Sequence, residues 1–287
     1  MNKKKNVLCI FIICCVVANI FSFDWPQLVN GSDSFYTYFG QERKSNFSNG
    51  LVFSNPSEVK SADKGKVIAI LEESISDMGW FSSPLGNTVI LSHPNELLTV
   101  YGNLEEISID KSTDTVESQQ VLGISRSTNW EKGMSCLEFQ VMDFKLKTVI
   151  NPLILMSTKP VLKPYNLTDI IGVSRTGQAF ELSKTRNVIA GMYTLYIKKD
   201  PSNMPYTTTV LINGTAVETI SYDVMKEVEG KLVIQGKKQY SFETIYPDQN
   251  RIFLAEVILP RGKNTIAVNI SDILGKEQQL QYVLDVK

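Results

Sequence analysis

The sequence predicts an all-β protein, and two observations carry this prediction. Short runs of alternating apolar and polar residues recur along the chain, separated by Gly, Asn, Pro and Asp, which is typical of strands that bury one face. Sustained helical periodicity is nearly absent after the N-terminal segment. The strands expected in the first half are Lys66–Leu71, Asn87–Ser92, Glu96–Tyr101 and Leu137–Phe144.

The second half shows the same pattern and contains two predicted hairpins. Asn213-Gly214 gives the stronger signal, because both residues of a two-residue hairpin turn must accept a positive φ. Pro260–Lys263 is expected to close the second hairpin. Seven or so short strands in about 125 residues predict a β-sandwich of immunoglobulin-like type. The expected strands are Gly191–Lys198, Tyr206–Ile212, Thr215–Tyr222, Leu232–Gln235, Ile252–Leu259, Asn264–Ile270 and Leu280–Val286.

Residues 1–22 have the features of a signal peptide. Lys3, Lys4 and Lys5 precede an apolar run from Val7 to Ala18, which is shorter than the roughly 20 residues that a membrane-spanning helix needs. Removal of this leader is expected to leave a chain that begins near Phe23. Two alternatives stay open, an uncleaved membrane anchor and a lipoprotein acylated at Cys14 or Cys15. We expect an exported protein that contacts the membrane only through this segment before cleavage.

Composition and charge fit a globular chain of two domains. The 287 residues are 43% hydrophobic and 21% charged, which is typical of folded domains. A net charge of −1 gives no general attraction to nucleic acid. Three of the four cysteines lie in the leader, so Cys136 alone remains after cleavage and no intramolecular disulfide can form. Asn151-Pro152, Pro160 and Pro164 indicate a boundary near residue 157, which gives domains 23–157 and 158–287.

A series of motifs between Tyr36 and Pro152 resembles the M23 (LytM, lysostaphin-like) peptidoglycan endopeptidases. Their order and spacing follow that family over about 115 residues, and the resemblance implies a β-sheet or barrel-type M23-like domain before the sandwich. The segments that carry it are Phe39-Gly40 with Arg43 (F-G-x-R), Phe47–Val52 (H-x-G-x-D), Gly86–Val89 with His93 (G-N-x-V and its histidine), Tyr101–Leu104 (Y-x-H-L), Val116–Gly123 (V-x-x-G-Q-x-I-G), Gly133–Val141 (G-x-x-H-L-H-F-E) and Asn151-Pro152.

The positions that carry the family's chemistry hold other residues here. The resemblance assigns zinc ligation to the positions of Ser48, Val52 and Glu138, and catalytic histidines to those of Asn103 and Cys136. Zinc needs N, S or O donors at about 2.0–2.3 Å, usually three from protein in a catalytic site. Valine has no lone pair and serine is a poor ligand. The sequence therefore predicts an inactive homologue of the zinc metalloendopeptidases, with no metal and no other cofactor.

Several residues are candidates for lining the groove or for taking part in its chemistry. His93, the single histidine of the chain, follows a strand and precedes Pro94, so we expect a structural or groove-lining role. Cys136 is expected to be a small buried apolar residue, with a cysteine nucleophile that uses His93 as its base as the alternative. Glu138 and Gln140 alternate with Leu137 and Phe139, which predicts one wet face for this strand. Aromatic residues expected to line the groove or anchor its loops are Trp80, Phe81, Tyr101 and Trp130.

The leading functional hypothesis is a non-catalytic pseudo-peptidase of the bacterial envelope or periplasm that binds peptidoglycan or regulates a cell-wall hydrolase. It is similar to degenerate LytM-domain proteins that activate cell-wall amidases. A groove without its metal still offers shape and backbone hydrogen bonds to a ligand. The alternatives are a structural envelope scaffold and a peptidoglycan hydrolase with a repurposed site. The expected partners are peptidoglycan, a cell-wall hydrolase or another envelope protein, and nucleic acid is not among them.

Overall fold

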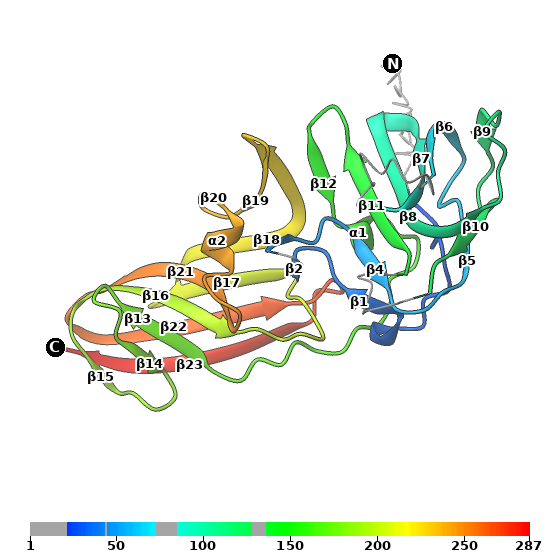
Figure 1. Ribbon diagram of the computed structural model, residues 1–287. Helices are drawn as coiled ribbons and strands as arrows, with labels where there is room; N and C mark the ends of the chain where they lie inside the picture. Colours follow the sequence, from blue (N-terminus) through cyan, green and yellow to red (C-terminus); the bar gives the residue numbers. More distant parts are fainter. Residues whose placement is uncertain (1–21, 44, 73–84, 128–135) are drawn as a thin grey trace, which may run out of the picture.

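The computed structural model describes residues 22–43, 45–72, 85–127 and 136–287, and strands make up nearly all of its regular structure (Figure 1). The predicted all-β class is therefore confirmed. Residues 1–21, which hold most of the expected leader, lie outside the described residues, as do Trp80, Phe81 and Trp130. Within the described ranges, no helix is long and apolar enough to cross a membrane.

The first half of the chain forms an antiparallel sheet whose centre is the strand order β6–β7–β8–β11. The strand β11 also pairs with β4 and β12, and β10 pairs with β8 and β5. The strands are β1 (Phe35–Thr37), β2 (Glu42–Arg43), β3 (Asn46–Phe47), β4 (Leu51–Phe53), β5 (Glu58–Lys60), β6 (Gly65–Leu71), β7 (Asn87–Ser92), β8 (Leu97–Ile107), β9 (Thr115–Val116), β10 (Val121–Ser125), β11 (Glu138–Asp143) and β12 (Thr148–Ile150).

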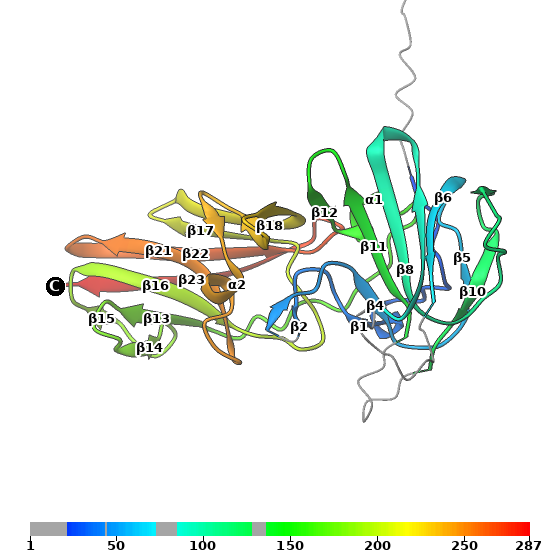
Figure 2. The ribbon, with the colours of Figure 1, turned by 45° about the horizontal axis from the view of Figure 1, so that its top comes forward.

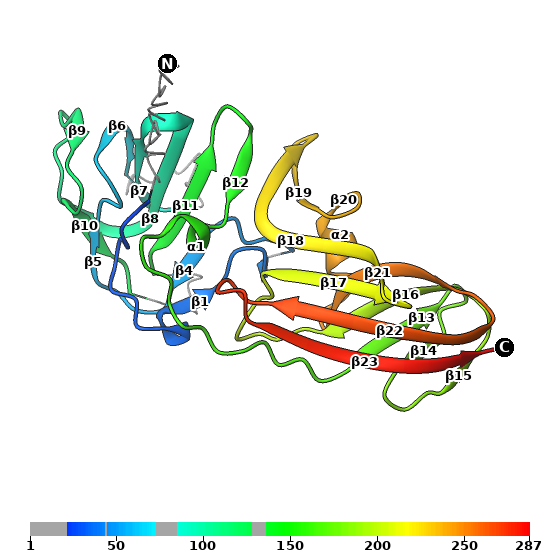
Figure 3. The ribbon, with the colours of Figure 1, turned by 180° about the vertical axis from the view of Figure 1, so that it is seen from behind.

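Two packed sheets form the second half, as Figure 3 shows with the larger sheet in front. The smaller sheet has the order β14–β13–β16–β21, and the larger one contains β15, β17 to β20, β22 and β23. The strands are β13 (Ile170–Ser174), β14 (Ala179–Glu181), β15 (Asn187–Val188), β16 (Gly191–Lys198), β17 (Thr207–Ile212), β18 (Thr215–Val228), β19 (Lys231–Gln235), β20 (Gln239–Tyr240), β21 (Arg251–Leu259), β22 (Gly262–Ser271) and β23 (Glu277–Val286).

Within the described residues, α-helix occurs in two short segments, α1 (Pro152–Leu155) and α2 (Phe242–Ile245), and 3-10 turns occur at Ser32–Ser34 and Pro94–Glu96. The helix α1 begins after Asn151, whose side-chain oxygen accepts the Leu153 N–H as an N-cap. Two apolar clusters stabilise the two halves. Leu51, Leu91, Leu122 and Phe139 belong to the first, and Leu195, Val210, Ala255 and Val268 are among the residues of the second. The immunoglobulin-like topology of the second half stays a prediction.

One of the two predicted hairpins is confirmed and the other is wrong. Asn213 and Gly214 have φ values of 51° and 80°, and they join β17 to β18 as an antiparallel pair. In contrast, β21 pairs with β16, whereas β22 pairs with β17 and β23, so Pro260–Lys263 carries the chain from one sheet to the other. The side chain of Asn264 donates to the carbonyl oxygens of Pro260 and Gly262. This contact closes the turn without pairing its flanking strands.

The two halves are joined by β-pairing, although Figure 2 shows them side by side along an elongated molecule. The strand β12 pairs with the distal part of β18, with Val149 opposite Met225. Next to this pair, the Asn151 side chain donates to the Tyr222 carbonyl oxygen over 3.0 Å. Phe39 and Phe47 of the first half belong to the apolar cluster of the second. The domain limits 23–157 and 158–287 stay a prediction, and the sheet is continuous across them.

Candidate functional site

Three strands bring the positions expected to carry the chemistry to one end of the first sheet. Glu138 opens β11 and lies opposite Val52 of β4 on one side and Gly102 of β8 on the other. Asn103 follows Gly102 along β8, and Cys136 lies two residues before Glu138. Val52, Asn103 and Glu138 thus lie on neighbouring strands, and Cys136 lies in the segment that leads into β11.

Glu138 is a buried, charge-paired residue. Its exposed fraction is 4%, and its Oε2 atom accepts a hydrogen bond from Arg43 Nη1 over 2.5 Å. Gln140 Nε2 donates to the other carboxylate oxygen over 2.8 Å, and Asn49 Nδ2 donates to Gln140 Oε1 over 3.3 Å. Hydrogen bonds to a guanidinium and an amide offset the desolvation of this carboxylate.

The wet face predicted for this strand is therefore wrong. Leu137, Glu138, Phe139 and Gln140 are all buried, because the apolar residues pack in the core while Arg43 contacts Glu138 and Asn49 contacts Gln140. In this strand, the alternation of polar and apolar residues corresponds to two faces that are both buried, each in a different environment. One is the apolar core that holds Phe139, and the other is the polar cluster of Arg43 with Glu138.

Ser48 and Gly50 shape the chain next to this cluster. Ser48 is buried, its N–H donates to the Gln41 carbonyl oxygen and its hydroxyl donates to the Gly50 carbonyl oxygen over 3.1 Å. A Cβ atom at Gly50 would lie 2.4 Å from the carbonyl oxygen of Phe139, so this position requires glycine. The Ser48 hydroxyl satisfies local backbone groups of its own segment.

Asn103 and Cys136 adjoin each other at the same end of the sheet. Asn103 has φ 60°, and its side-chain nitrogen lies 3.4 Å from the Cys136 carbonyl oxygen. The side chain of Cys136 has no exposed surface and belongs to the apolar cluster of the first half. This placement agrees with the expectation of a small buried apolar residue.

His93 and Tyr101 are buried residues with structural hydrogen bonds, and of the structural or groove-lining role expected for His93 these contacts favour the structural one. His93 Nδ1 donates to the Lys64 carbonyl oxygen over 2.9 Å, and Nε2 accepts from the Thr99 hydroxyl over 2.7 Å. Burial lowers the pKa of His93 below its usual value of 6.5, although the contact with Lys64 opposes this shift. Tyr101 is fully buried, its hydroxyl accepts the Ala62 N–H, and burial raises its pKa to about 12.

The alternative of a Cys136 nucleophile with His93 as its base is also wrong. Thr99, which His93 contacts, lies opposite Val141 in the pairing of β8 with β11. Cys136 precedes Val141 by five residues, which corresponds to about 17 Å of extended chain. A histidine must lie within hydrogen-bond reach of a thiol to act as its base, and here the two side chains sit at different levels of the sheet.

Arg43 is the functional residue whose role the sequence did not reveal. It lies on β2, which forms a two-stranded hairpin with β3, and its partner Glu138 is 95 residues away along the chain. The F-G-x-R element marked Arg43 as part of the resemblance, but no local pattern indicates which carboxylate it contacts. The cluster of Arg43, Glu138, Gln140 and Asn49 is called the Arg43–Glu138 cluster below.

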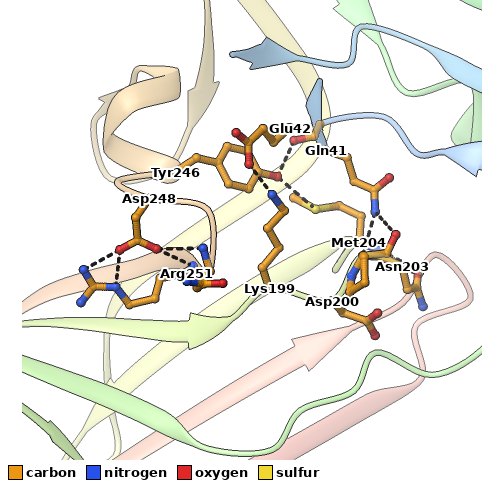
Figure 4. Close-up of polar contacts among 12 residues, drawn as sticks. Gln41, Glu42, Lys199, Asp200, Asn203, Met204, Tyr246, Asp248 and Arg251 are labelled. Carbon is orange, nitrogen blue, oxygen red and sulfur yellow. Dashed lines mark hydrogen bonds and ion pairs between the residues drawn. The ribbon is translucent and has the colours of Figure 1, made fainter. Parts of the chain in front are cut away.

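The same β2–β3 hairpin is fixed to the second half of the chain (Figure 4). Glu42 forms an ion pair with Lys199, and Gln41 Nε2 donates to the Asn203 carbonyl oxygen over 3.1 Å. The Tyr246 hydroxyl donates to the Gly40 carbonyl oxygen over 2.8 Å. Phe47 packs against the rings of Phe242 and Tyr246. The segment that presents Arg43 to Glu138 is thus held from the other side by the second half.

The residues present do not fit a zinc ion. Val52 offers no donor atom, the Ser48 hydroxyl is engaged with Gly50, and Glu138 is neutralised by a cation that already contacts its carboxylate. Within the described part of the chain, no group of three or more His, Cys, Asp or Glu side chains is placed to share a metal. A zinc ion next to the Arg43 guanidinium would also experience like-charge repulsion.

Two family models match the chain. The model described as peptidase family M23 matches residues 46–152, which contain β3 to β12. A second family model matches residues 164–287. No curated protein is significantly similar to the chain.

Several solved structures are similar to it at low identity. The catalytic domain of the prophage-encoded M23 protein EnpA from Enterococcus faecalis is 17% identical over 43% of this chain and 88% of that chain, with a TM-score of 0.33. The SpoIIQ–SpoIIIAH pore forming complex is 23% identical over 45% of this chain and 74% of that chain, with a TM-score of 0.30. Lysostaphin is 16% identical over 85% of this chain and 90% of that chain, with a TM-score of 0.32. At these identities, the likenesses concern the fold alone.

Proposed function

We propose that this chain, whose residues 46–152 match the model of peptidase family M23, is a non-catalytic member of that family that binds peptidoglycan or regulates a cell-wall hydrolase in the bacterial envelope. The observation that carries the proposal is the Arg43–Glu138 cluster. A guanidinium contacts the carboxylate at a position where the resemblance implies a zinc ligand, and Val52 lies opposite that carboxylate. The strands that carry these positions are paired, and the charge of the Glu138 carboxylate is neutralised by Arg43.

The loss of the metal removes the chemistry of peptide hydrolysis. In a zinc peptidase, the metal polarises the scissile carbonyl and acidifies the attacking water. Neither function has a substitute here, because Asn103 is not a base and Cys136 is buried in the apolar core. Arg43 itself cannot release a proton near neutral pH. The residues of this site therefore have a structural role and take no part in proton transfer.

Binding is the role that such a site retains. We assign the ligand contacts to the aromatic residues of the two segments that lie outside the described residues, Trp80 and Phe81 in one and Trp130 in the other. Aromatic rings offer large apolar faces that can stack against sugar rings and apolar parts of peptides. The expected leader places this binding in the periplasm or at the envelope, with peptidoglycan or a wall hydrolase as the partner.

Co-sedimentation with purified peptidoglycan tests this proposal. We expect the chain to pellet with the polymer, and we expect the triple variant Trp80→Ala, Phe81→Ala, Trp130→Ala to lose most of this binding. The matched control is Ile189→Ala with Ile258→Ala, which removes two exposed apolar side chains of the second half. Equal pelleting of the parent and the triple variant, or no pelleting of the parent, contradicts a peptidoglycan ligand at this site.

A second candidate function, a structural envelope scaffold, is favoured by the junction between the halves. The pairing of β12 with β18 and the contacts of the β2–β3 hairpin make one continuous unit of the two halves. A scaffold would use the outer surface of the second half, so loss of cellular function in the Ile189→Ala, Ile258→Ala variant, but not in the aromatic triple variant, would favour this alternative.

A further inference from the structure

The C-terminal strand β23 forms one edge of the larger sheet, which lies in front in Figure 3. Among the described residues, it pairs with β22 along its whole length, from Glu277 to Val286. On its other side it pairs with the short strand β15 at Asp285 and Val286. There the Asp285 N–H donates to the Arg186 carbonyl oxygen over 2.7 Å. The rest of this outer edge lies next to no strand of the described chain.

The outer edge of β23 carries a row of backbone groups that point away from β22. Alternate residues of a strand direct their N–H and C=O groups to the same edge. Because Asp285 points its N–H outward, the residues that do the same are Glu277, Gln279, Gln281 and Val283. Within the described residues, no backbone hydrogen bond joins these four to another segment on that side. All four are exposed, so a further strand can reach this edge.

The edge of β23 lacks the features that keep edge strands from pairing. Such strands are usually short, bulged, or interrupted by lysine or proline. The pairing of β23 with β22 is regular throughout, and the segment Gln278–Leu284 contains no charged residue and no proline. In contrast, β21 at the edge of the smaller sheet has an irregular register with β16 and an ion pair of Glu256 with Lys238. The sequence of β23 therefore favours a partner strand.

The two ends of this free edge carry opposite net charge. Acidic residues outnumber basic ones where β23 begins, and the charged residues there are Asp272, Lys276 and Glu277. Basic residues outnumber acidic ones where β23 meets β15, and the charged residues there are Arg186, Lys263, Asp285 and Lys287. Antiparallel pairing of two identical strands brings the acidic end of each against the basic end of the other. Such an arrangement is electrostatically complementary, which points to a second copy of this chain as the partner.

We propose that β23 pairs in antiparallel fashion with β23 of a second copy of this chain, so that the two larger sheets become one. In the register centred on Leu280, Glu277 of one copy lies opposite Val283 of the other, and Gln279 lies opposite Gln281. Every outward N–H and C=O group of these residues then has a partner. No charged residue lies opposite another charged residue. Each copy offers one such edge, so the assembly closes as a dimer.

This pairing determines where the two first halves lie. Ile273, in the turn before β23, packs against the apolar cluster of the first half, and β23 runs from there to the far end of the molecule (Figure 1). Antiparallel pairing therefore places the two first halves at opposite ends of the dimer, each with its own Arg43–Glu138 cluster. A polymer with repeated sites would then be bound at two points. The pairing itself is independent of what the cluster binds.

Sedimentation velocity over a wide range of protein concentrations tests the inference. The protein is residues 23–287, the chain expected after removal of the leader, and we expect an equilibrium between monomer and dimer. The edge-lysine variant, Gln279→Lys with Gln281→Lys, places lysines opposite lysines at the centre of the pair. Because like charges directly opposite each other destabilise a strand pair, this variant should dimerise at least about tenfold more weakly. Hydrogen exchange at the N–H groups of Gln279 and Gln281 should slow at concentrations where the parent dimerises.

Matched variants separate the edge from the rest of the sheet. The control Thr207→Lys, Thr219→Lys adds the same charge to the same face on β17 and β18, away from the edge, and it should dimerise like the parent. Glu277→Arg should weaken the dimer, and Glu277→Arg with Arg186→Glu should recover most of the loss. Thermal unfolding verifies that each variant folds. The proposal is overturned if the parent stays monomeric or forms larger assemblies, if the edge-lysine variant dimerises as the parent does, or if the control loses as much.

Discussion

Val52 lies directly opposite Glu138 where β4 pairs with β11. The resemblance assigns zinc ligation to both positions, and the first is now apolar while the second is paired with Arg43. A single replacement would leave a weakened metal site. Here the carboxylate is paired with a cation of the chain itself, so no metal is needed to balance its charge. These positions form an ordered ion-pair cluster.

Removal of Arg43 should destabilise the protein more than a surface substitution does. Arg43→Met leaves the carboxylate of Glu138, whose side chain is 6% exposed, without its cation and with the Gln140 amide as a hydrogen-bond donor. Breaking a buried ion pair at one partner costs several kcal/mol, and because the Arg43 side chain is 23% exposed we expect about 1–3 kcal/mol. Urea unfolding measures this loss. The double variant Arg43→Met, Glu138→Gln should recover most of it, and equal stability of parent and Arg43→Met would contradict the account.

Rebuilding the ligand set should create a zinc site. The changes Ser48→His, Val52→Asp and Glu138→His restore the family's donors, and Arg43→Ala removes the competing cation. Three protein donors at one end of a rigid sheet are the requirement of a catalytic zinc site. Isothermal titration should show zinc binding for this variant and none for the parent. The control retains the native Val52 and carries Ser48→His, Glu138→His and Arg43→Ala. It should bind zinc at least about tenfold more weakly than the full variant. Equally tight binding by the parent would be inconsistent with the structure.

Gly50→Ala should be among the most damaging single substitutions near the site. Its Cβ would lie 2.4 Å from the Phe139 carbonyl oxygen and 2.8 Å from Gln140 Cγ, so β4 and β11 must separate. Forced overpacking costs about 1–3 kcal/mol. Gly214→Asn is the matched control, because Gly214 has φ 80° with open space around it and asparagine tolerates this conformation. Thermal unfolding should show a clearly lower Tm for Gly50→Ala alone.

The contact between the halves should contribute measurably to stability. Tyr246→Phe removes the hydroxyl that donates to Gly40, and its ring keeps its packing against Phe47. A buried hydrogen bond of this kind contributes about 0.5–1.5 kcal/mol. Hydrogen exchange should then show faster exchange at the β2–β3 hairpin than in the parent. Unchanged exchange there would mean that the second half does not hold the hairpin.

Protonation of His93 should weaken the fold as the pH falls. Burial lowers the folded-state pKa of His93 below the value of 6.5 that it has when unfolded. The unfolded chain therefore binds more protons below about pH 6.5, and stability decreases as the pH falls through this range and levels off below the folded-state pKa. Urea unfolding between pH 7.5 and 5 should show this slope in the parent and a shallower one in His93→Gln. Identical slopes would assign the dependence to other groups.

The sequence predicts the strands well where alternation and turn chemistry decide, and less well where distant contacts do. The strands Asn87–Ser92 and Gly191–Lys198 have the predicted bounds. The strand β18 extends to Val228, because its distal part pairs with β12 and β19, and no local pattern marks such a partner. The turn after Leu259 lacks a hairpin for the same reason, since turn residues do not determine which sheet the next strand joins.

For the candidate site, too, the sequence predicts one part and not the other. The order of motifs predicts that Val52, Asn103 and Glu138 come together, and the strand pairing agrees. The ion pair of Glu138 with Arg43 depends on a hairpin held by Tyr246 and Lys199 from the second half. That arrangement arises from long-range packing, which alternation within a single strand does not encode.

The most direct test of the central claim is the release of soluble muropeptides from purified peptidoglycan by residues 23–287 with zinc supplied. The account predicts no release above a heat-denatured control, because the Arg43–Glu138 cluster takes the place of the metal site. The variant that rebuilds the ligand set, measured beside it, shows whether zinc reaches this position in the assay buffer. Release by the parent that a chelator abolishes would contradict the account.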